Sequence, residues 1–119
     1  MANLQSLLIV EDEPLIAMLL EDFARSLGYE VAGGADTVDG ALARVEQGGF
    51  DGAILDVTLR GGEECWPVAD ALASRNIPFV LATGGHISAP PECHADVPTL
   101  IKPYTLDGFR AALGRLEIV

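Results

Sequence analysis

Short apolar runs alternate with segments of helical periodicity along the whole chain. The runs predict five strands, at residues 7–10, 29–35, 53–55, 78–83 and 99–101. Between and after them, apolar residues recur every three or four positions, which is the spacing of one helix face. These segments predict helices at residues 14–27, 38–47, about 64–75 and 106–116.

Local signals support the predicted helix ends. Pro14 suits the first position of the first helix, and Gly28 suits the position just beyond its C-terminal end. Pro67 falls in the first turn of the third helix, where proline is tolerated. The candidate N-caps of the first, second and last helices are Asp12 or Glu13, Asp36 or Thr37, and Thr105, respectively.

The order of elements predicts the fold class. Strands that alternate with helices form a parallel sheet with helices on both faces, and continuous apolar strands suit a sheet buried on both sides. We therefore predict an α/β protein with a doubly wound five-stranded parallel sheet, in one domain spanning residues 1–119. Ligands of such sheets bind beyond the carboxyl ends of the strands.

Polar residues follow four of the five strands where each one ends. Glu11 and Asp12 follow the first strand and Asp56 follows the third. Thr83 ends the fourth strand, and Lys102 follows the fifth. Because parallel strands end at one edge of the sheet, we expect these side chains to gather there.

That group predicts a site for Mg²⁺ and a phosphoryl group. Three clustered carboxylates require a cation, and oxygen ligands suit Mg²⁺. A carboxylate beside the metal, such as Asp56, can act as a nucleophile toward phosphorus. The hydroxyl of Thr83 and the ammonium of Lys102, the only lysine, would then face the phosphoryl oxygens.

Each residue also has an ordinary structural interpretation. The acidic triplet 11–13 could complement the dipole of the following helix, and Asp56 could simply begin a loop. Thr83 precedes two glycines and Lys102 precedes a proline, as in turns. The occurrence of all five at strand ends of one alternating pattern favours a functional site.

The overall charge excludes several classes of partner. The chain has 18 acidic and 7 basic residues, a formal net charge of −11, so it lacks the basic face that nucleic acids or anionic membranes require. It has no apolar run near the roughly 20 residues of a membrane span, and no signal peptide. We expect a cytoplasmic protein without a disulfide framework, since it has only two cysteines.

Four segments in this order resemble the receiver domains of two-component response regulators. They are Leu7–Pro14 (LLIVEDEP), Ala53–Thr58 (AILDVT), Phe79–Gly85 (FVLATGG) and Leu100–Tyr104 (LIKPY). The resemblance extends over essentially the whole chain. It implies the flavodoxin-like receiver fold with strand order 2-1-3-4-5.

The resemblance also implies a role for each residue. Asp56 matches the phospho-accepting aspartate, Thr83 the switch hydroxyl and Lys102 the phosphate-binding lysine. Glu11 and Asp12 match the acidic pair that holds Mg²⁺, and Thr58 would add its backbone carbonyl to the metal. The family further implies a cis peptide bond at Lys102-Pro103.

Two features depart from the family. Thr99 stands where an aromatic switch residue is usual, although Tyr104 lies nearby. The segment 84–98 normally holds a helix, but its two leading glycines and its prolines predict a loop or one short turn. The segment 78–85 is also similar to the FAT GUY subgroup of receivers, which implies kinases of the HWE or a related class.

The family implies a stand-alone response regulator that accepts phosphate on Asp56 from a histidine kinase or phosphotransferase. The signal would leave through contacts with a downstream protein or by phosphorelay; a phosphate sink and an unphosphorylated docking module are the alternatives. A phosphohydrolase would carry a second aspartate where Thr58 stands, so we expect no enzyme turnover on free substrates. A flavodoxin-like cofactor-binding protein would hold a phosphate in the loop after the first strand, and the acidic triplet 11–13 would repel that phosphate.

Cys93, His94 and His86 raise the question of a second, softer metal site. Three such residues on one flexible loop are too few and poorly spaced for a zinc site. We therefore expect Mg²⁺ alone.

Overall fold

The computed structural model describes residues 5–83, 91–101 and 103–116. Its centre is one sheet of five parallel strands in the order β2-β1-β3-β4-β5, which confirms the predicted fold class and strand order. The strands are β1 (Ser6–Val10), β2 (Glu30–Ala35), β3 (Gly52–Asp56), β4 (Phe79–Thr83) and β5 (Thr99–Ile101).

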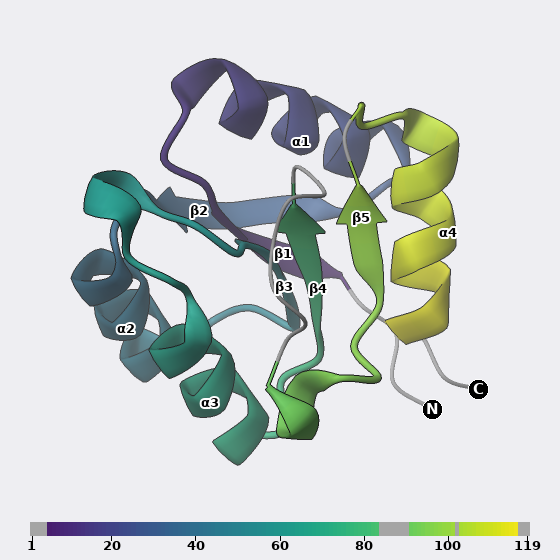
Figure 1. The fold of residues 1–119 in the computed structure, drawn as a ribbon. Coiled ribbons are helices and arrows are strands. Elements are labelled where there is room, and N and C mark those ends of the chain that lie inside the picture. The colour runs from purple at the N-terminus through teal and green to yellow at the C-terminus, as the bar shows by residue number, and fades with distance from the viewer. Residues whose placement is uncertain (1–4, 84–90, 102, 117–119) are drawn as a thin grey trace.

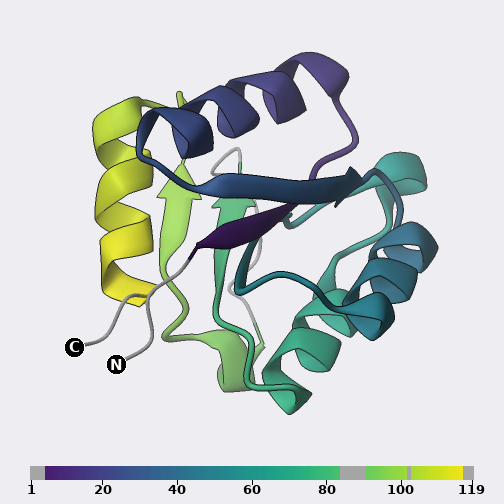
Figure 2. The ribbon, with the colours of Figure 1, turned by 180° about the vertical axis from the view of Figure 1, so that it is seen from behind.

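Four α-helices form the outer layers of the molecule. Figure 1 and the reverse view in Figure 2 show α1 and α4 over one face of the sheet and α2 and α3 over the other. None of the helices that the structure describes has the length and apolar character needed to cross a bilayer. The helices are α1 (Pro14–Ser26), α2 (Val38–Gln47), α3 (Trp66–Ser74) and α4 (Leu106–Leu116).

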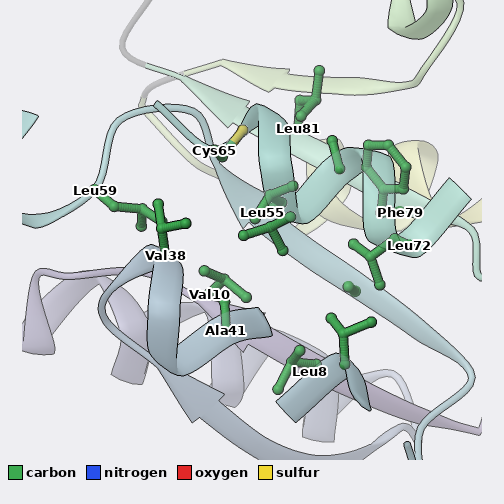
Figure 3. Close-up of a cluster of buried hydrophobic side chains, with 14 of the residues drawn as sticks. Leu8, Val10, Val38, Ala41, Leu55, Leu59, Cys65, Leu72, Phe79 and Leu81 are labelled. Carbon is green, nitrogen blue, oxygen red and sulfur yellow. The ribbon is translucent and has the colours of Figure 1, made fainter. Parts of the chain in front are cut away.

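The apolar strands divide the core into two clusters, one on each face. Leu8, Val10 and Leu55 point toward α2 and α3, where Leu72 completes the packing (Figure 3). The alternate residues of the same strands, such as Ile9 and Ile54, pack against α1 and α4. This two-sided burial explains why the strands read as continuous apolar runs.

Capping signals are confirmed at two helices and corrected at a third. The Oγ1 of Thr37 accepts the backbone N–H of Gly40, and the Oγ1 of Thr105 accepts that of Gly108, each at 3.0 Å. Glu13 occupies the N-cap position of α1, as predicted, but its side chain makes no capping hydrogen bond, so the expected side-chain cap is absent. The N–H of Glu13 donates to the carboxylate of Glu11.

Strand β2 contains an irregularity beside its pair of glycines. Leu7 pairs with Val31 and Leu8 with Gly33, so Ala32 is an extra residue in the ladder. Its carbonyl accepts a 2.7 Å hydrogen bond from Nη2 of Arg44 on α2. Gly33 has φ +144°, and a Cβ there would lie 2.6 Å from the same Nη2. The glycine therefore permits both the bulge and the arginine contact.

The connection from β4 to β5 is described from residue 91 onward. In that part its only helical element is a 3₁₀ turn at Glu92–His94, which agrees with the predicted short turn in place of a helix. The predictions for residues 84–90 and for a cis bond at Lys102-Pro103 fall outside the described residues.

Candidate functional site

Strand register brings the predicted acidic residues together. Strands β1 and β3 are neighbours, and Val10 pairs with Leu55. Glu11 follows Val10 and Asp56 follows Leu55, so the two carboxylates leave the sheet side by side. The backbone N–H of Glu11 donates to the carbonyl of Ala35 at 3.0 Å, which fixes the start of the loop that carries Asp12.

Glu11, Asp12 and Asp56 form a carboxylate cluster. Each contributes an oxygen, and these oxygens lie within 4.8 Å of one another. Glu11 is 7% exposed, whereas Asp12 and Asp56 are half-buried and open toward solvent. The oxygen-only donor set and the open side fit a Mg²⁺ ion that keeps part of its water shell.

The electrostatics of this carboxylate cluster favour a cation. Burial raises the pKa of Glu11 from 4.5 to about 8. The N–H of Glu13 opposes that shift, while the charge of Asp56 and side-chain hydrogen bonds with Asp56 and Asp12 add to it. Without a cation the cluster therefore retains a proton near neutral pH, and a divalent ion would take that proton's place.

Thr58 lies next to the cluster through its backbone. Its N–H lies 3.4 Å from Oδ1 of Asp56 and donates to it, while the residue itself is exposed. Coordination of a metal by its carbonyl stays a prediction. The following loop folds back tightly, with Thr58 bridging to Glu64 and the N–H of Leu59 donating to the carbonyl of Glu63.

Thr83 lies further along the same edge of the sheet. Asp56 pairs with Ala82, so Thr83 is one residue beyond the level of Asp56 on the adjacent strand. It is 4% exposed. Thr83 in turn pairs with Ile101, the residue before Lys102. Lys102 itself is outside the described residues, and its predicted role stays a prediction.

Tyr104 is an aromatic residue whose hydroxyl is influenced by the carboxylate cluster. It is buried, and burial together with the charges of Asp56 and Glu11 raises the pKa of its hydroxyl. Thr99, by contrast, is exposed, and its hydroxyl donates to the carbonyl of Val97 at 3.3 Å. Sequence analysis placed Tyr104 near the lysine but assigned it no role.

A cavity of about 280 Å³ opens beside the cluster. Glu11, Asp12, Asp36 and Arg60 are among its lining residues. Nη2 of Arg60 lies 2.8 Å from Oδ2 of Asp36, which joins the loop after β3 to the loop after β2. Sequence analysis missed this pair because nothing in the spacing of two exposed residues 24 positions apart indicates a contact.

Buried Cys65 is not a second nucleophile at this site. Its thiol has a pKa raised to about 12, first by burial and then by the negative charge of Asp56. The backbone of Cys65 helps to fix the loop after β3, since its N–H donates to the carbonyl of Val57 at 2.8 Å. A thiol that stays protonated at neutral pH is a poor nucleophile, so the carboxylates of the cluster remain the candidates for that role.

Solved structures provide close matches over the whole chain. The chain is similar to SdrG from Sphingomonas melonis Fr1 in its solution structure, with 58% identity, a TM-score of 0.88, and coverage of 99% of this chain and 100% of that chain. A solution structure of the BeF3-activated conformation of SdrG from Pseudomonas melonis Fr1 matches with 58% identity, a TM-score of 0.83 and the same coverage.

A more distant structure extends the comparison. The PhyR response regulator REC domain from Erythrobacter litoralis is 29% identical, with a TM-score of 0.80, over 95% of this chain and 89% of that chain. Comparisons with protein-family models and with curated proteins found no match.

Proposed function

Because the chain belongs to the receiver domains of response regulators, we propose that it accepts a phosphoryl group on Asp56 from a histidine kinase or a histidine phosphotransferase. The observation that carries this proposal is the carboxylate cluster of Glu11, Asp12 and Asp56 at the carboxyl edge of the sheet. The BeF3-activated structure of SdrG supports phosphorylation-dependent signalling in a protein 58% identical to this one.

The proposed reaction is a direct transfer between the two proteins. An Oδ of Asp56 attacks phosphorus, the bond from phosphorus to the histidine nitrogen breaks, and its electron pair returns to the imidazole. Glu11 and Asp12, with the carbonyl of Thr58, would hold Mg²⁺ beside the acceptor oxygen. That ion supplies charge neutralisation for the phosphoryl oxygens.

The remaining contacts on the phosphoryl group come from the adjacent strands. The hydroxyl of Thr83 would donate to one phosphoryl oxygen and the ammonium of Lys102 would neutralise another. Hydrolysis of the aspartyl phosphate by water would reset the domain. We propose no turnover on free substrates, since Thr58 stands where a phosphohydrolase would need a second carboxylate acting as acid and base.

The finer assignments rest on particular segments. The segment 78–85 supports a kinase of the HWE or a related class. The two free cysteines agree with a reducing cytoplasm. The proposed output is contact with a downstream protein or onward transfer of phosphate; service as a phosphate sink for a kinase is the second candidate, favoured by the same acceptor site.

A small phosphodonor with Mg²⁺ tests the proposal without the cognate kinase. Intact mass should increase by one phosphoryl group, and Asp56→Asn should abolish the increase. Asp39→Asn, at an exposed site in the first turn of α2, is the matched control and should react like the wild type. Absence of a phosphoryl adduct with both a small donor and purified kinases would overturn the assignment.

A further inference from the structure

His94, in the 3₁₀ turn before β5, is buried among aromatic and polar contacts. It is 3% exposed, and its ring stacks on Trp66 with centroids 6.2 Å apart and planes 12° apart. The edge of Phe79 contacts the same ring at 5.6 Å. Its Nε2 lies 2.8 Å from Oδ1 of Asp70 on α3. The imidazole is therefore fixed in position by contacts on several sides.

Cys93 completes a group of three ligand types around this imidazole. The Sγ of Cys93, a ring nitrogen of His94 and a carboxylate oxygen of Asp70 lie within 4.8 Å of one another. Figure 1 shows the short turn before β5 beside the C-terminal end of α3, near the starts of β4 and β5. The group thus lies at the opposite edge of the sheet from Asp56, and Cys93 also lines a cavity there with Pro78 and Asp96.

We propose that Cys93, His94 and Asp70 bind Zn²⁺, with water as a fourth ligand. Thiolate, imidazole and carboxylate are the three ligand types of protein zinc sites, and three protein ligands plus water is the composition of an open site. Mg²⁺ disfavours sulfur and nitrogen, so this site differs in metal preference from the carboxylate cluster. On binding, the thiol proton of Cys93 passes to solvent, and a proton on the ligating ring nitrogen of His94 moves to the other ring nitrogen.

The geometry requires a small rearrangement at an exposed residue. Tetrahedral ligands about 2.0–2.3 Å from Zn²⁺ lie roughly 3.3–3.7 Å apart. The 2.8 Å contact between Asp70 and His94 must widen, and the thiol must approach. The side chain of Asp70 is 67% exposed and Cys93 is exposed, so both can move while the aromatic contacts hold His94 in place.

A zinc ion here would join two parts of the fold. Asp70 belongs to α3, whereas Cys93 and His94 belong to the connection that leads from β4 to β5. That connection begins after Thr83 and ends one strand before Lys102, so zinc would restrain the chain between the two predicted phosphoryl contacts. The effect on the domain would be stabilisation by mass action.

Co²⁺ provides a direct probe, because a bound thiolate gives it a charge-transfer absorption that carboxylates do not. The titration is made in excess Mg²⁺, which occupies the carboxylate cluster, and Zn²⁺ is then added as competitor. We expect one equivalent of Co²⁺ to produce the thiolate band and one equivalent of Zn²⁺ to remove it. Absence of the band in the folded wild-type protein would overturn the proposal.

Three variants separate this site from general attraction of cations. Cys93→Ser should abolish the band, and Asp70→Asn should weaken Co²⁺ binding by about tenfold or more while its amide keeps a polar group beside Nε2 of His94. Asp96→Asn removes an exposed carboxylate lining the same cavity and should bind like the wild type. Wild-type affinity in Asp70→Asn, or equal weakening in Asp96→Asn, would overturn the assignment.

Discussion

Replacing Glu11 by Gln should change how the stability of the metal-free protein depends on pH. The folded pKa of Glu11 is about 8 against an ordinary 4.5, so folding takes up a proton between these values. The stability that this proton confers is complete below pH 4.5 and is lost as pH rises toward 8. The loss is about 1.4 kcal/mol per pH unit within that window, or about 2–3 kcal/mol between pH 5 and pH 7.

Glu11→Gln removes the titration and keeps the local contact, because the amide oxygen can still accept the N–H of Glu13 that lies 3.1 Å from the carboxylate. Urea unfolding of both proteins in a chelator, at several pH values from 5 to 8, gives the difference in slope. Titrating groups outside the carboxylate cluster occur in both proteins and cancel, so the difference in slope reports the coupled titration of the cluster. Glu46→Gln, at an exposed site on α2, serves as the control.

The wild type should lose stability with rising pH more steeply than Glu11→Gln, and saturating Mg²⁺ should remove this steeper loss. The ion binds the deprotonated carboxylate cluster, so the folded state then holds no proton on Glu11 for rising pH to remove. At a Mg²⁺ concentration of 100 times Kd the gain is about 2.7 kcal/mol. Equal slopes for wild type and Glu11→Gln would refute the burial argument.

Three further changes have defined outcomes. Asp12→Ala should abolish the rise in melting temperature that Mg²⁺ produces in the wild type, as followed by calorimetry; a retained rise would exclude Asp12 as a ligand. Gly33→Ala should destabilise the fold by about 1–3 kcal/mol, because it places a Cβ against Arg44 at a positive φ, whereas Gly114→Ala on the open side of α4 should stabilise it by about 0.5–1 kcal/mol. Urea unfolding measures both changes, and a shift of the free energy of unfolding in the same direction for both variants would contradict this reasoning. Thr37→Ala should cost about 1 kcal/mol through loss of the α2 cap, and unchanged stability would show that the cap is dispensable.

The sequence was sufficient to predict the structure where the local pattern of apolar and polar residues determines it. Val10 and Leu55 end apolar runs, so the acidic residues after them had to reach the same edge of a parallel sheet. Strand ends alone therefore placed Glu11 and Asp56 at one edge, and the strand order implied by the family resemblance made them neighbours. The 3₁₀ turn at 92–94 likewise follows from a proline-rich segment that disfavours a longer helix.

Contacts between exposed side chains distant in sequence were not predictable. Asp36 and Arg60 carry no apolar or glycine signal, and their ion pair depends on how two loops approach after the sheet has formed. Asp70 was similarly invisible as a neighbour of His94, since helix periodicity places it only on the outer side of α3.

The hydrogen bond between Glu11 and Glu13 at the start of α1 was also not predictable from local pattern. Glu11 is held by its own backbone bond to Ala35, and its carboxylate accepts the N–H of Glu13. The same contact fixes the carboxylate of Glu11 within the cluster, which links the helix start to the site.

The central claim is that Asp56 forms an aspartyl phosphate in a Mg²⁺-dependent reaction. After incubation with a small phosphodonor and Mg²⁺, borohydride reduction converts an aspartyl phosphate to homoserine, which peptide mass mapping locates. We expect homoserine at position 56 alone, and none when a chelator replaces Mg²⁺. Homoserine at another aspartate, or formation at position 56 without Mg²⁺, would contradict it.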